Sequence, residues 1–398
     1  MKNKICLQNK FIFILFFLLI LIILICCNDY NQTKKEITKF NLIISDTFCI
    51  FIDTSTSTFT KAIFYHKEQK KRYLVFNDEI NRMINFYNID NRKKEFSIKI
   101  QNEGKFYIPY NNGFIVKKID SIYIPTDALK IYLINRYGEI LKCFAYDTIN
   151  HYQQLIPAVS LTRFHSPIIF NGNYMYAPQT DAIYSYYNNN PANYKFCYRF
   201  NLTNYEAVLM PIHHPEDFWY NGVRELLCSW DFDGDRFIYS PICSHDIYIS
   251  YDNNKIDEIK KVESKYVKKL LYYDPNNKKD INNAFRLKVE NQEYIGIAYD
   301  QFRNIYYRFF SSGYKGRYLK NKELFERYLN PPNFGIMVLN KDLNILCEVI
   351  LPENIYSQHK FFIAEEGLYL SADNPNNPKL KEDEWCFHIY NLDELKNN

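Results

Sequence analysis

Residues 335–351, with the sequence GIMVLNKDLNILCEVIL, constrain the fold more than any other stretch of this chain. Residues 335–339 and 343–349 each follow the period of two that is typical of a β-strand. The polar segment between them contains Asn340, Asp342 and Asn344, whose side chains can bond nearby backbone groups and tolerate left-handed dihedral angles. Two such runs around a short turn predict a β-hairpin.

Looser copies of this hairpin recur along the chain. A second hairpin precedes most copies, often with Asn-Gly or Gly at the turn, where a positive φ is needed. Four strands per unit, repeated at roughly 50–60 residues, are the signature of propeller blades. The copies are predicted at residues 84–100, 131–145, 194–209, 247–256, 335–351 and, in part, 387–390.

The last copy is incomplete, because the chain ends soon after 387–390. A propeller must close its ring, so we predict that a strand within 42–52 completes the last blade. The expected fold is therefore all-β, a six-bladed β-propeller over residues 41–398 closed by an N-terminal strand. Seven blades are the alternative, if 53–66 forms part of an extra blade.

Two segments outside the strand pattern are candidates for short helices. The apolar residues of 262–271 are spaced for one or two amphipathic turns. Residues 319–329 form the second candidate, which Pro331 and Pro332 would end.

The N-terminus carries a predicted export signal. Three lysines and no acid precede the apolar run 11–25, which a pair of cysteines follows. A basic segment, an apolar run and a stop form a secretory signal. The run is shorter than the roughly 20 residues that span a membrane. An uncleaved anchor helix is the alternative.

Residues 24–27 resemble the lipobox of a bacterial lipoprotein signal. The residue before the lipidated cysteine is normally small, which favours Cys27 over Cys26, because Ile25 precedes Cys26. We expect a signal peptide over 1–26, lipidation of Cys27 and a flexible tether over 27–40. The protein would then lie in the cell envelope, anchored to membrane lipid, most simply at the outer membrane.

Net charge argues against nucleic acid as a partner. The formal charge is +4, and removal of residues 1–26, with three lysines and no acids, lowers it to +1. Nucleic-acid-binding domains carry a basic footprint that this balance does not provide. Aromatic residues make up 18% of the chain, and strands favour such side chains.

Seven cysteines remain beyond the signal and Cys27. Several lie within alternating strands, where a thiol behaves as a small hydrophobe. The odd, scattered set predicts free buried thiols rather than a disulfide framework. No Cys-x-x-Cys pair and no His at ligand spacing accompany them, so we expect neither a zinc site nor another cofactor. They are Cys49, Cys143, Cys197, Cys228, Cys243, Cys347 and Cys386.

Three segments carry a family resemblance: FDGDRFIYS at 232–240, KFFIAEEGLYLS at 360–371 and NPNNP at 374–378. With the lipoprotein start, they resemble a Bacteroidota family of six-bladed β-propeller lipoproteins, a domain of unknown function related in fold to TolB-like propellers. The resemblance covers residues 41–398. It implies six blades and a membrane anchor, and no established activity.

Asp231, Asp233 and Asp235 are spaced like the first ligands of a calcium loop. An EF-hand loop has its Gly after the third acid and a Glu at position twelve. Here Gly234 comes before the third acid and Ile242 occupies position twelve. We therefore expect a turn into a strand, and no metal site.

Cationic and aromatic side chains mark a possible ligand-binding face, since such side chains suit a stacking and hydrogen-bonding surface. No catalytic residue can be named, because GxSxG, a phosphate-binding Gly loop and HExxH are all lacking. The expected function is an exported, membrane-anchored lipoprotein that binds or scaffolds a protein or glycan. A propeller hydrolase or lyase with its site in the central funnel is the alternative. The residues of the possible face are Arg163, His165, His213, His214, Trp219, Tyr220 and Arg224.

Overall fold

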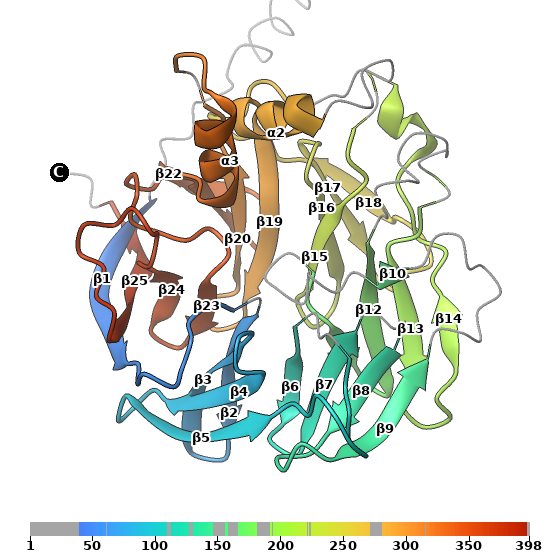
Figure 1. Ribbon diagram of the computed structural model, residues 1–398. Helices are drawn as coiled ribbons and strands as arrows, with labels where there is room; N and C mark the ends of the chain where they lie inside the picture. The colour runs from blue at the N-terminus through green and yellow to red at the C-terminus, as the bar shows by residue number, and fades with distance from the viewer. Residues whose placement is uncertain are drawn as a thin grey trace, which may run out of the picture. The chain divides into compact units, whose positions relative to one another are not determined.

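The computed structural model describes residues 40–395 except 61, 110–112, 127–129, 146–155, 158–165, 181–191, 193, 221, 223, 271–280 and 315. Within these residues six antiparallel sheets follow one another as the blades of a ring (Figure 1). The predicted all-β, six-bladed propeller is confirmed. The signal peptide, the tether up to residue 39, Cys27, Arg163 and His165 lie outside the described residues, so their predictions stay open.

The first three blades come from the N-terminal half of the propeller. In blade 3, the strands Ile156–Pro157 and Ile169–Asn171 both pair with the strand Tyr174–Thr180. Blade 1 contains β2 (Ile63–Glu68), β3 (Lys71–Asp78), β4 (Met83–Asn88) and β5 (Lys93–Lys99). Blade 2 contains β6 (Ile115–Lys118), β7 (Ser121–Thr126), β8 (Lys130–Ile134) and β9 (Ile140–Ala145). Blade 3 contains β10 (Ile156–Pro157), β11 (Ile169–Asn171), β12 (Tyr174–Thr180), β13 (Cys197–Asn201) and β14 (Ala207–Leu209).

The other three blades complete the ring, and the last one takes its outer strand from the N-terminal side. Blade 4 contains β15 (Cys228–Phe232), β16 (Phe237–Pro241), β17 (Asp246–Ser250) and β18 (Glu258–Lys261). Blade 5 contains β19 (Glu293–Asp300), β20 (Ile305–Ser311), β21 (Gly335–Asn340) and β22 (Ile345–Ile350). Blade 6 contains β23 (Phe361–Ala364), β24 (Gly367–Ser371), β25 (Glu384–Glu394) and β1 (Phe40–Phe51).

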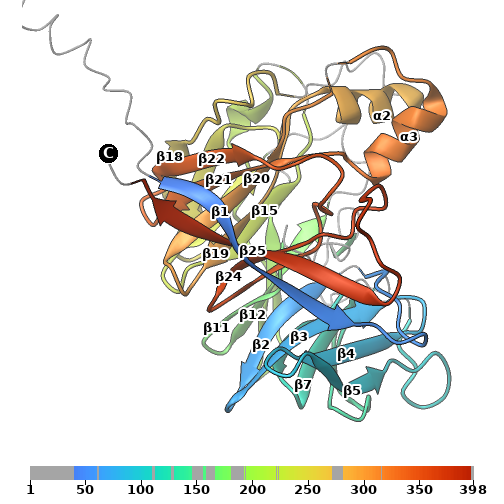
Figure 2. The ribbon, with the colours of Figure 1, turned by 90° about the vertical axis from the view of Figure 1, so that its left-hand side faces the viewer.

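Ring closure occurs as predicted. Strand β1 pairs antiparallel with β25 from Phe40↔Glu394 to Phe51↔Glu384, with one irregularity after Ile44 (Figure 2). The closing strand predicted within 42–52 is thus β1, which spans Phe40–Phe51. The seven-blade alternative is wrong, because Ile63 already begins β2, the inner strand of blade 1.

The hairpin at 335–351 forms as predicted, from β21 and β22. Asn340 Oδ1 accepts a hydrogen bond of 2.8 Å from Asn344 N across the turn. The left-handed residue is Leu343, with φ 60°, and its side chain is buried in the core between blades 4 and 5. Gly335 is required by packing, since a Cβ there would lie 2.1 Å from the Phe310 ring.

The hydrophobic core is divided among the interfaces between neighbouring blades. Six major clusters of buried side chains fill the spaces between consecutive sheets. The cluster between blades 5 and 6, for example, joins Phe309 and Ile336 to Phe361 and Leu368, and includes Leu42 of β1. Because every blade packs on two neighbours, an open ring would expose two such faces at once.

One of the two predicted helices is confirmed. The segment 319–329 contains α3 (Asn321–Leu329), which lies beside α2 (Ile281–Glu290) on one face of the ring (Figure 2). The sequence analysis did not predict α2. No helix within the described ranges is long and apolar enough to cross a membrane.

The predicted helix at 262–271 is wrong, because residues 262–269 form a loop held by polar side chains of blade 5. Gln292 Oε1 accepts hydrogen bonds from the amides of Lys268 and Lys269 at 2.5 and 2.7 Å. Ser264 N donates to Tyr294 Oη at 3.1 Å. These side chains satisfy backbone amides that a helix would otherwise satisfy internally.

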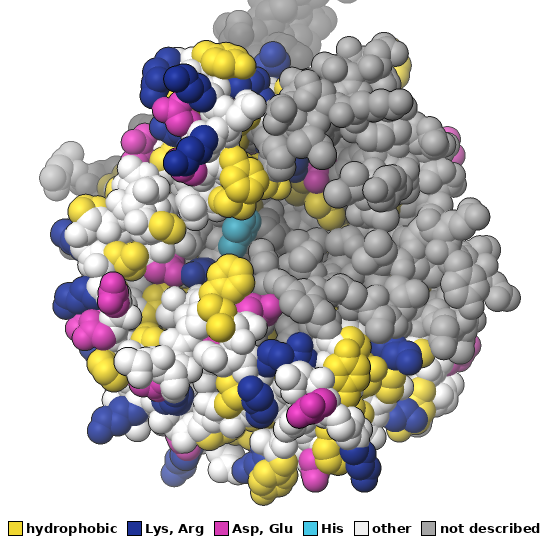
Figure 3. All heavy atoms as spheres, viewed as in Figure 1, with side chains coloured by type: hydrophobic (Ala, Val, Ile, Leu, Met, Phe, Trp, Pro, Cys, Tyr) yellow, Lys and Arg dark blue, Asp and Glu magenta, His cyan; other side chains and the backbone are white. Residues whose placement is uncertain are grey.

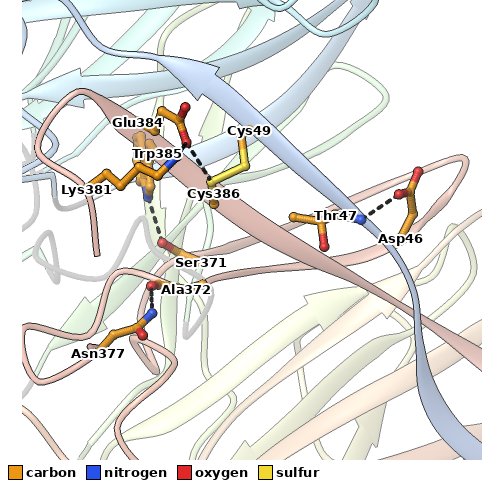
Figure 4. The surroundings of a disulfide bond; sticks show 10 residues. All are labelled: Asp46, Thr47, Cys49, Ser371, Ala372, Asn377, Lys381, Glu384, Trp385 and Cys386. Carbon is orange, nitrogen blue, oxygen red and sulfur yellow. Dashed lines mark hydrogen bonds and ion pairs between the residues drawn. A yellow bond between two sulfur atoms is a disulfide. The ribbon is translucent and has the colours of Figure 1, made fainter. Parts of the chain in front are cut away.

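The prediction of free thiols is wrong for two cysteines. Cys49 of β1 and Cys386 of β25 form a disulfide across the closing pair of strands (Figure 4). Their backbone register makes them direct partners, with Cα atoms 4.1 Å apart. Antiparallel pairing thus brings together two residues 337 positions apart. The other described cysteines form no disulfide.

The disulfide should stabilise the closed ring. We expect the double variant Cys49→Ser/Cys386→Ser to lose about 2–4 kcal/mol of unfolding free energy, because the crosslink restricts the unfolded chain. Denaturant unfolding measures this loss. Dithiothreitol should lower the stability of the wild type and leave the double variant unchanged. Equal stability of both proteins under oxidising conditions would contradict the expectation.

Candidate functional site

A cavity of about 610 Å³ lies at one mouth of the central channel, on the face that carries α2 and α3. It is lined by residues at or just before the inner strands of five blades, such as Phe59 ahead of β2, Ser166 ahead of β11 and Lys360 ahead of β23. Figure 3 shows this face, with charged side chains around the rim and hydrophobic side chains and a histidine toward its middle. We call this cavity the channel mouth.

A lysine flanked by two acids forms one wall of the channel mouth. Lys288 of α2 donates a hydrogen bond to Glu225 Oε2 and lies 3.6 Å from Glu293 Oε2. Burial raises the pKa of the Glu293 carboxyl, and the nearby lysine opposes that shift. Since Glu225 precedes β15 and Glu293 begins β19, the ion pairs tie the helix to the inner strands of blades 4 and 5.

A second ion pair lies in blade 6. Lys360 Nζ lies 2.5 Å from Asp373 Oδ2, and Ser371 Oγ donates to the other carboxylate oxygen at 2.6 Å. The indole of Trp385 in turn donates to Ser371 Oγ at 2.7 Å. Trp385 thus positions Ser371, Ser371 positions Asp373, and Asp373 positions Lys360. The position of the lysine therefore depends on the packed interior of the blade.

A narrower cavity of about 320 Å³ is lined by residues from the inner strands of all six blades and is largely apolar. Asp231 is its titratable carboxylate. Its Oδ2 accepts a hydrogen bond of 2.7 Å from Tyr299 N, which links β15 to β19. Burial raises the pKa of this carboxyl to about 6.

The three aspartates of the 231–235 segment have separate partners. Asp233 accepts hydrogen bonds from Arg236 and from Tyr306 Oη, the latter at 2.6 Å. Asp235 pairs with Lys341 at 3.1 Å. Among the described residues, the one group with metal-ligand geometry is Cys49, Glu384 and Cys386, which includes the disulfide.

Three small polar side chains of the channel mouth, Ser166, Cys228 and Ser229, bond to backbone groups. Ser229 Oγ accepts from Ile297 N at 2.9 Å, and Ser166 Oγ donates to Cys228 O at 3.2 Å. Burial raises the pKa of the Cys228 thiol well above its usual value, which keeps it protonated and unreactive. A nucleophile needs an adjacent base or a lowered pKa. These three side chains are therefore not activated as nucleophiles.

His214, a member of the predicted ligand-binding face, belongs to the core. Its ring is fully buried against Phe196 and Phe218, and its Nε2 lies 2.7 Å from Leu226 O. Burial lowers its pKa to about 3. A ring enclosed in this way cannot contact a ligand. His213 is half-buried, with Nδ1 2.6 Å from His214 O.

The other described members of that face have different roles. Arg224 is buried and donates to Phe218 O and Cys243 O at 2.7 and 2.8 Å. Trp219 Nε1 donates to Arg224 O at 3.1 Å, whereas Tyr220 is 88% exposed. None of the five described members lines the channel mouth. Arg224 instead anchors the segment whose next residue is Glu225.

The sequence analysis missed the charged residues of the channel mouth. A signal was present: Glu293 begins the inner strand β19, and Lys360 immediately precedes β23. Charged residues at the starts of inner strands lie together in a propeller, because these strands run side by side around the channel. Lys288 lacked such a signal, since α2 was not predicted.

A family model, described as a domain of unknown function (DUF4221), matches residues 39–350. The chain belongs to this family. The predicted family resemblance is thereby confirmed. No curated protein matches the sequence.

Two solved structures are similar to this member of the DUF4221 family. One is a DUF4221 protein from Bacteroides vulgatus, with 21% identity and a TM-score of 0.75, covering 90% of this chain and 99% of its own. The other is described as an exported protein from Bacteroides fragilis, with 9% identity and a TM-score of 0.52, covering 91% and 98%. At these identities the likeness supports the propeller fold alone.

Burial of His214 predicts a pH dependence of stability. The pKa of a histidine in the unfolded chain is about 6.5, whereas the pKa of His214 in the folded protein is about 3. Between these two pH values, His214 therefore binds a proton in the unfolded chain and stays neutral in the folded protein. Stability from neutral His214 is therefore present above about pH 6.5 and lost as the pH falls toward 3. The loss approaches about 1.4 kcal/mol per pH unit.

The variant His214→Gln should have a smaller decrease in unfolding free energy between pH 6.5 and 4 than the wild type. The control His213→Gln should keep the wild-type slope, because His214 is intact. Urea unfolding at a series of pH values measures both. Parallel pH profiles for His214→Gln and the wild type would rule out this role.

Proposed function

We propose that this protein is an exported lipoprotein, anchored through Cys27, whose propeller binds a ligand or partner protein at the channel mouth. Residues 1–26 would be the signal peptide and 27–40 the tether. The observation that carries the binding role is the channel mouth itself, a cavity of about 610 Å³ assembled from five blades. Concave sites of this size, with a few placed polar groups, are typical of ligand binding.

The proposed export has two supports besides the N-terminal signal. The Cys49–Cys386 disulfide fits an oxidising compartment, since disulfides are rare where thiols are kept reduced. The similar protein from Bacteroides fragilis is described as exported. A short polar tether would hold the propeller close to the membrane and leave its faces accessible.

The chemistry of the channel mouth supports binding without turnover. Its lysines are held by carboxylates, and Ser166, Ser229 and Cys228 bond to backbone groups. Aromatic and amide side chains, among them Phe59, Tyr328, Asn330 and Gln358, provide stacking and hydrogen-bonding surfaces. A glycan or a peptide segment would match such a set.

Lipid anchoring is tested with Cys27→Ser in the full-length protein. We expect the variant to leave the membrane fraction, because acyl chains give stable anchoring and a polar tether does not. The matched variant Cys26→Ser should remain with the membrane. Fractionation followed by an alkaline wash measures both. Retention of Cys27→Ser after the wash would instead support an uncleaved anchor helix.

Binding at the channel mouth is tested by screening glycans and peptides for a thermal shift and for turnover. For any ligand found, we expect Phe59→Ala/His359→Ala to weaken binding about tenfold, as loss of central contacts commonly does. Both residues line the channel mouth. No turnover is expected.

The control His213→Ala/Tyr220→Ala alters the other predicted face. It should leave affinity unchanged. Affinity lost in this control and kept in Phe59→Ala/His359→Ala would move the site to that face. Turnover that disappears in Phe59→Ala/His359→Ala would favour the propeller hydrolase or lyase.

A further inference from the structure

A second cavity, of about 700 Å³, opens beside the channel mouth and carries an excess of positive charge. We call it the lateral groove. Its walls are the loop after β18, the ends of α2 and α3, and the segment after β20. It shares lining residues with the channel mouth, among them Lys288, Glu293 and Gln358. The two cavities are therefore neighbours.

Four cationic side chains line the groove against two acidic ones. The cations are Lys265, Lys268, Lys288 and Arg327, and the acids are Glu293 and Glu353. Lys288 is held by Glu225 and also lies 3.6 Å from Glu293. Apart from this cluster, the charged lining residues are the cations Lys265, Lys268 and Arg327 and one carboxylate, Glu353, so this part of the groove favours an anion.

These three cations are weakly neutralised within the described part of the chain. Lys268 is 64% exposed and lies 4.0 Å from Glu263, which pairs more closely with Lys261 at 3.0 Å. Lys265 Nζ lies 4.9 Å from the centre of the Tyr266 ring, and the Arg327 guanidinium 4.4 Å from that of Tyr314. A cation over an aromatic ring keeps its charge and its hydrogen-bond donors.

The wall that carries two of the lysines is held in place by a buried side chain. Gln292 accepts from the amides of Lys268 and Lys269, and its Nε2 donates to Tyr266 O and Ser312 O at 2.9 and 3.0 Å. This single amide joins the two sides of the groove. The loop is therefore already ordered in the free protein, so binding does not carry the entropic cost of ordering it.

We propose that the lateral groove binds a small polyanion, a ligand with several carboxylate or phosphate groups. Lysine and arginine together suit such oxyanions, because the ammonium provides a point charge and the guanidinium can donate two parallel hydrogen bonds. The volume exceeds what a single inorganic ion fills, which favours a ligand with groups spaced to meet several cations. This proposal does not depend on a ligand in the channel mouth.

The test is isothermal titration of the full-length protein in non-ionic detergent, at constant ionic strength, with citrate and with pyrophosphate. Triethyl citrate, which has the same carbon skeleton without the charges, is the neutral probe. We expect saturable binding of at least one anion and none of the ester. Preference between the two anions distinguishes a carboxylate ligand from a phosphate ligand.

The variant Lys265→Gln/Arg327→Gln should weaken anion binding about tenfold, since charged hydrogen-bonded contacts are removed. The matched control Lys255→Gln/Arg317→Gln removes one lysine and one arginine that line neither cavity and are largely exposed. It should change affinity by less than about twofold. If the groove variant fails to fold, the exposed single change Lys268→Gln should still weaken binding.

Three results would overturn the proposal: no saturable binding of either anion, equal binding of triethyl citrate, or an equal loss in the control variant. The channel-mouth variant Phe59→Ala/His359→Ala should leave anion binding unchanged. Failure of the groove proposal is therefore distinguishable from failure of the proposal for the channel mouth.

Discussion

The pairing of β1 with β25 is the interaction on which the ring depends. It joins residues 40–51 to 384–394, so nearly the whole propeller lies between the two strands in sequence. The pair contributes Leu42 and Tyr390 to the core between blades 5 and 6, and Phe48 and Phe387 to the core between blades 6 and 1. Closing so long a loop has an entropic cost, although this cost grows only slowly with length. The Cys49–Cys386 disulfide removes much of that cost from the folding equilibrium.

Hydrogen bonds from polar side chains also connect blades 4, 5 and 6. Arg308 of β20 is fully buried, lies over the Tyr294 ring, and donates to Ser240 Oγ and to backbone oxygens of blade 4, among them Val262 O at 2.8 Å. Arg303, which is partly buried and paired with Asp300, donates to Ala364 O and Glu365 O of blade 6. Burying a cation costs free energy unless its hydrogen-bond donors all have acceptors. These contacts therefore restrict how the neighbouring blades can pack against one another. They fix three of the five blades that line the channel mouth.

The sequence predicted the features that depend on neighbouring residues. The hairpin at β21–β22 and the half-copy at β25 were recognisable because strand periodicity and turn chemistry are local. The free-thiol prediction failed for Cys49 and Cys386 because it considered each cysteine within its own strand and did not consider the residue opposite it on the neighbouring strand. Their pairing requires the register of the closing strands, which one sequence does not determine.

Other features were misread because burial is decided by distant residues. The adjacent His213 and His214 looked like a functional pair, yet His214 fills a core formed by aromatic side chains of blades 3 and 4. The loop at 262–269 has helical spacing, but Gln292 and Tyr294, over twenty residues away, hold its backbone in another conformation. Polar partners supplied by the next blade thus override a local pattern.

The two cavities share a wall, but the cationic side chains that line them have different partners, so the cavities differ in the charge of the ligand that they suit. At the channel mouth, Lys288 and Lys360 already have carboxylate partners, so an anion entering there would compete with ion pairs that the fold has built. In the lateral groove, Lys265 and Arg327 lie over tyrosine rings instead, and an anion would gain contacts without breaking a carboxylate pair. The channel mouth therefore suits neutral polar groups, and the lateral groove suits negative charge. A ligand long enough to occupy both cavities would therefore need a neutral polar part in the channel mouth and a negatively charged part in the lateral groove.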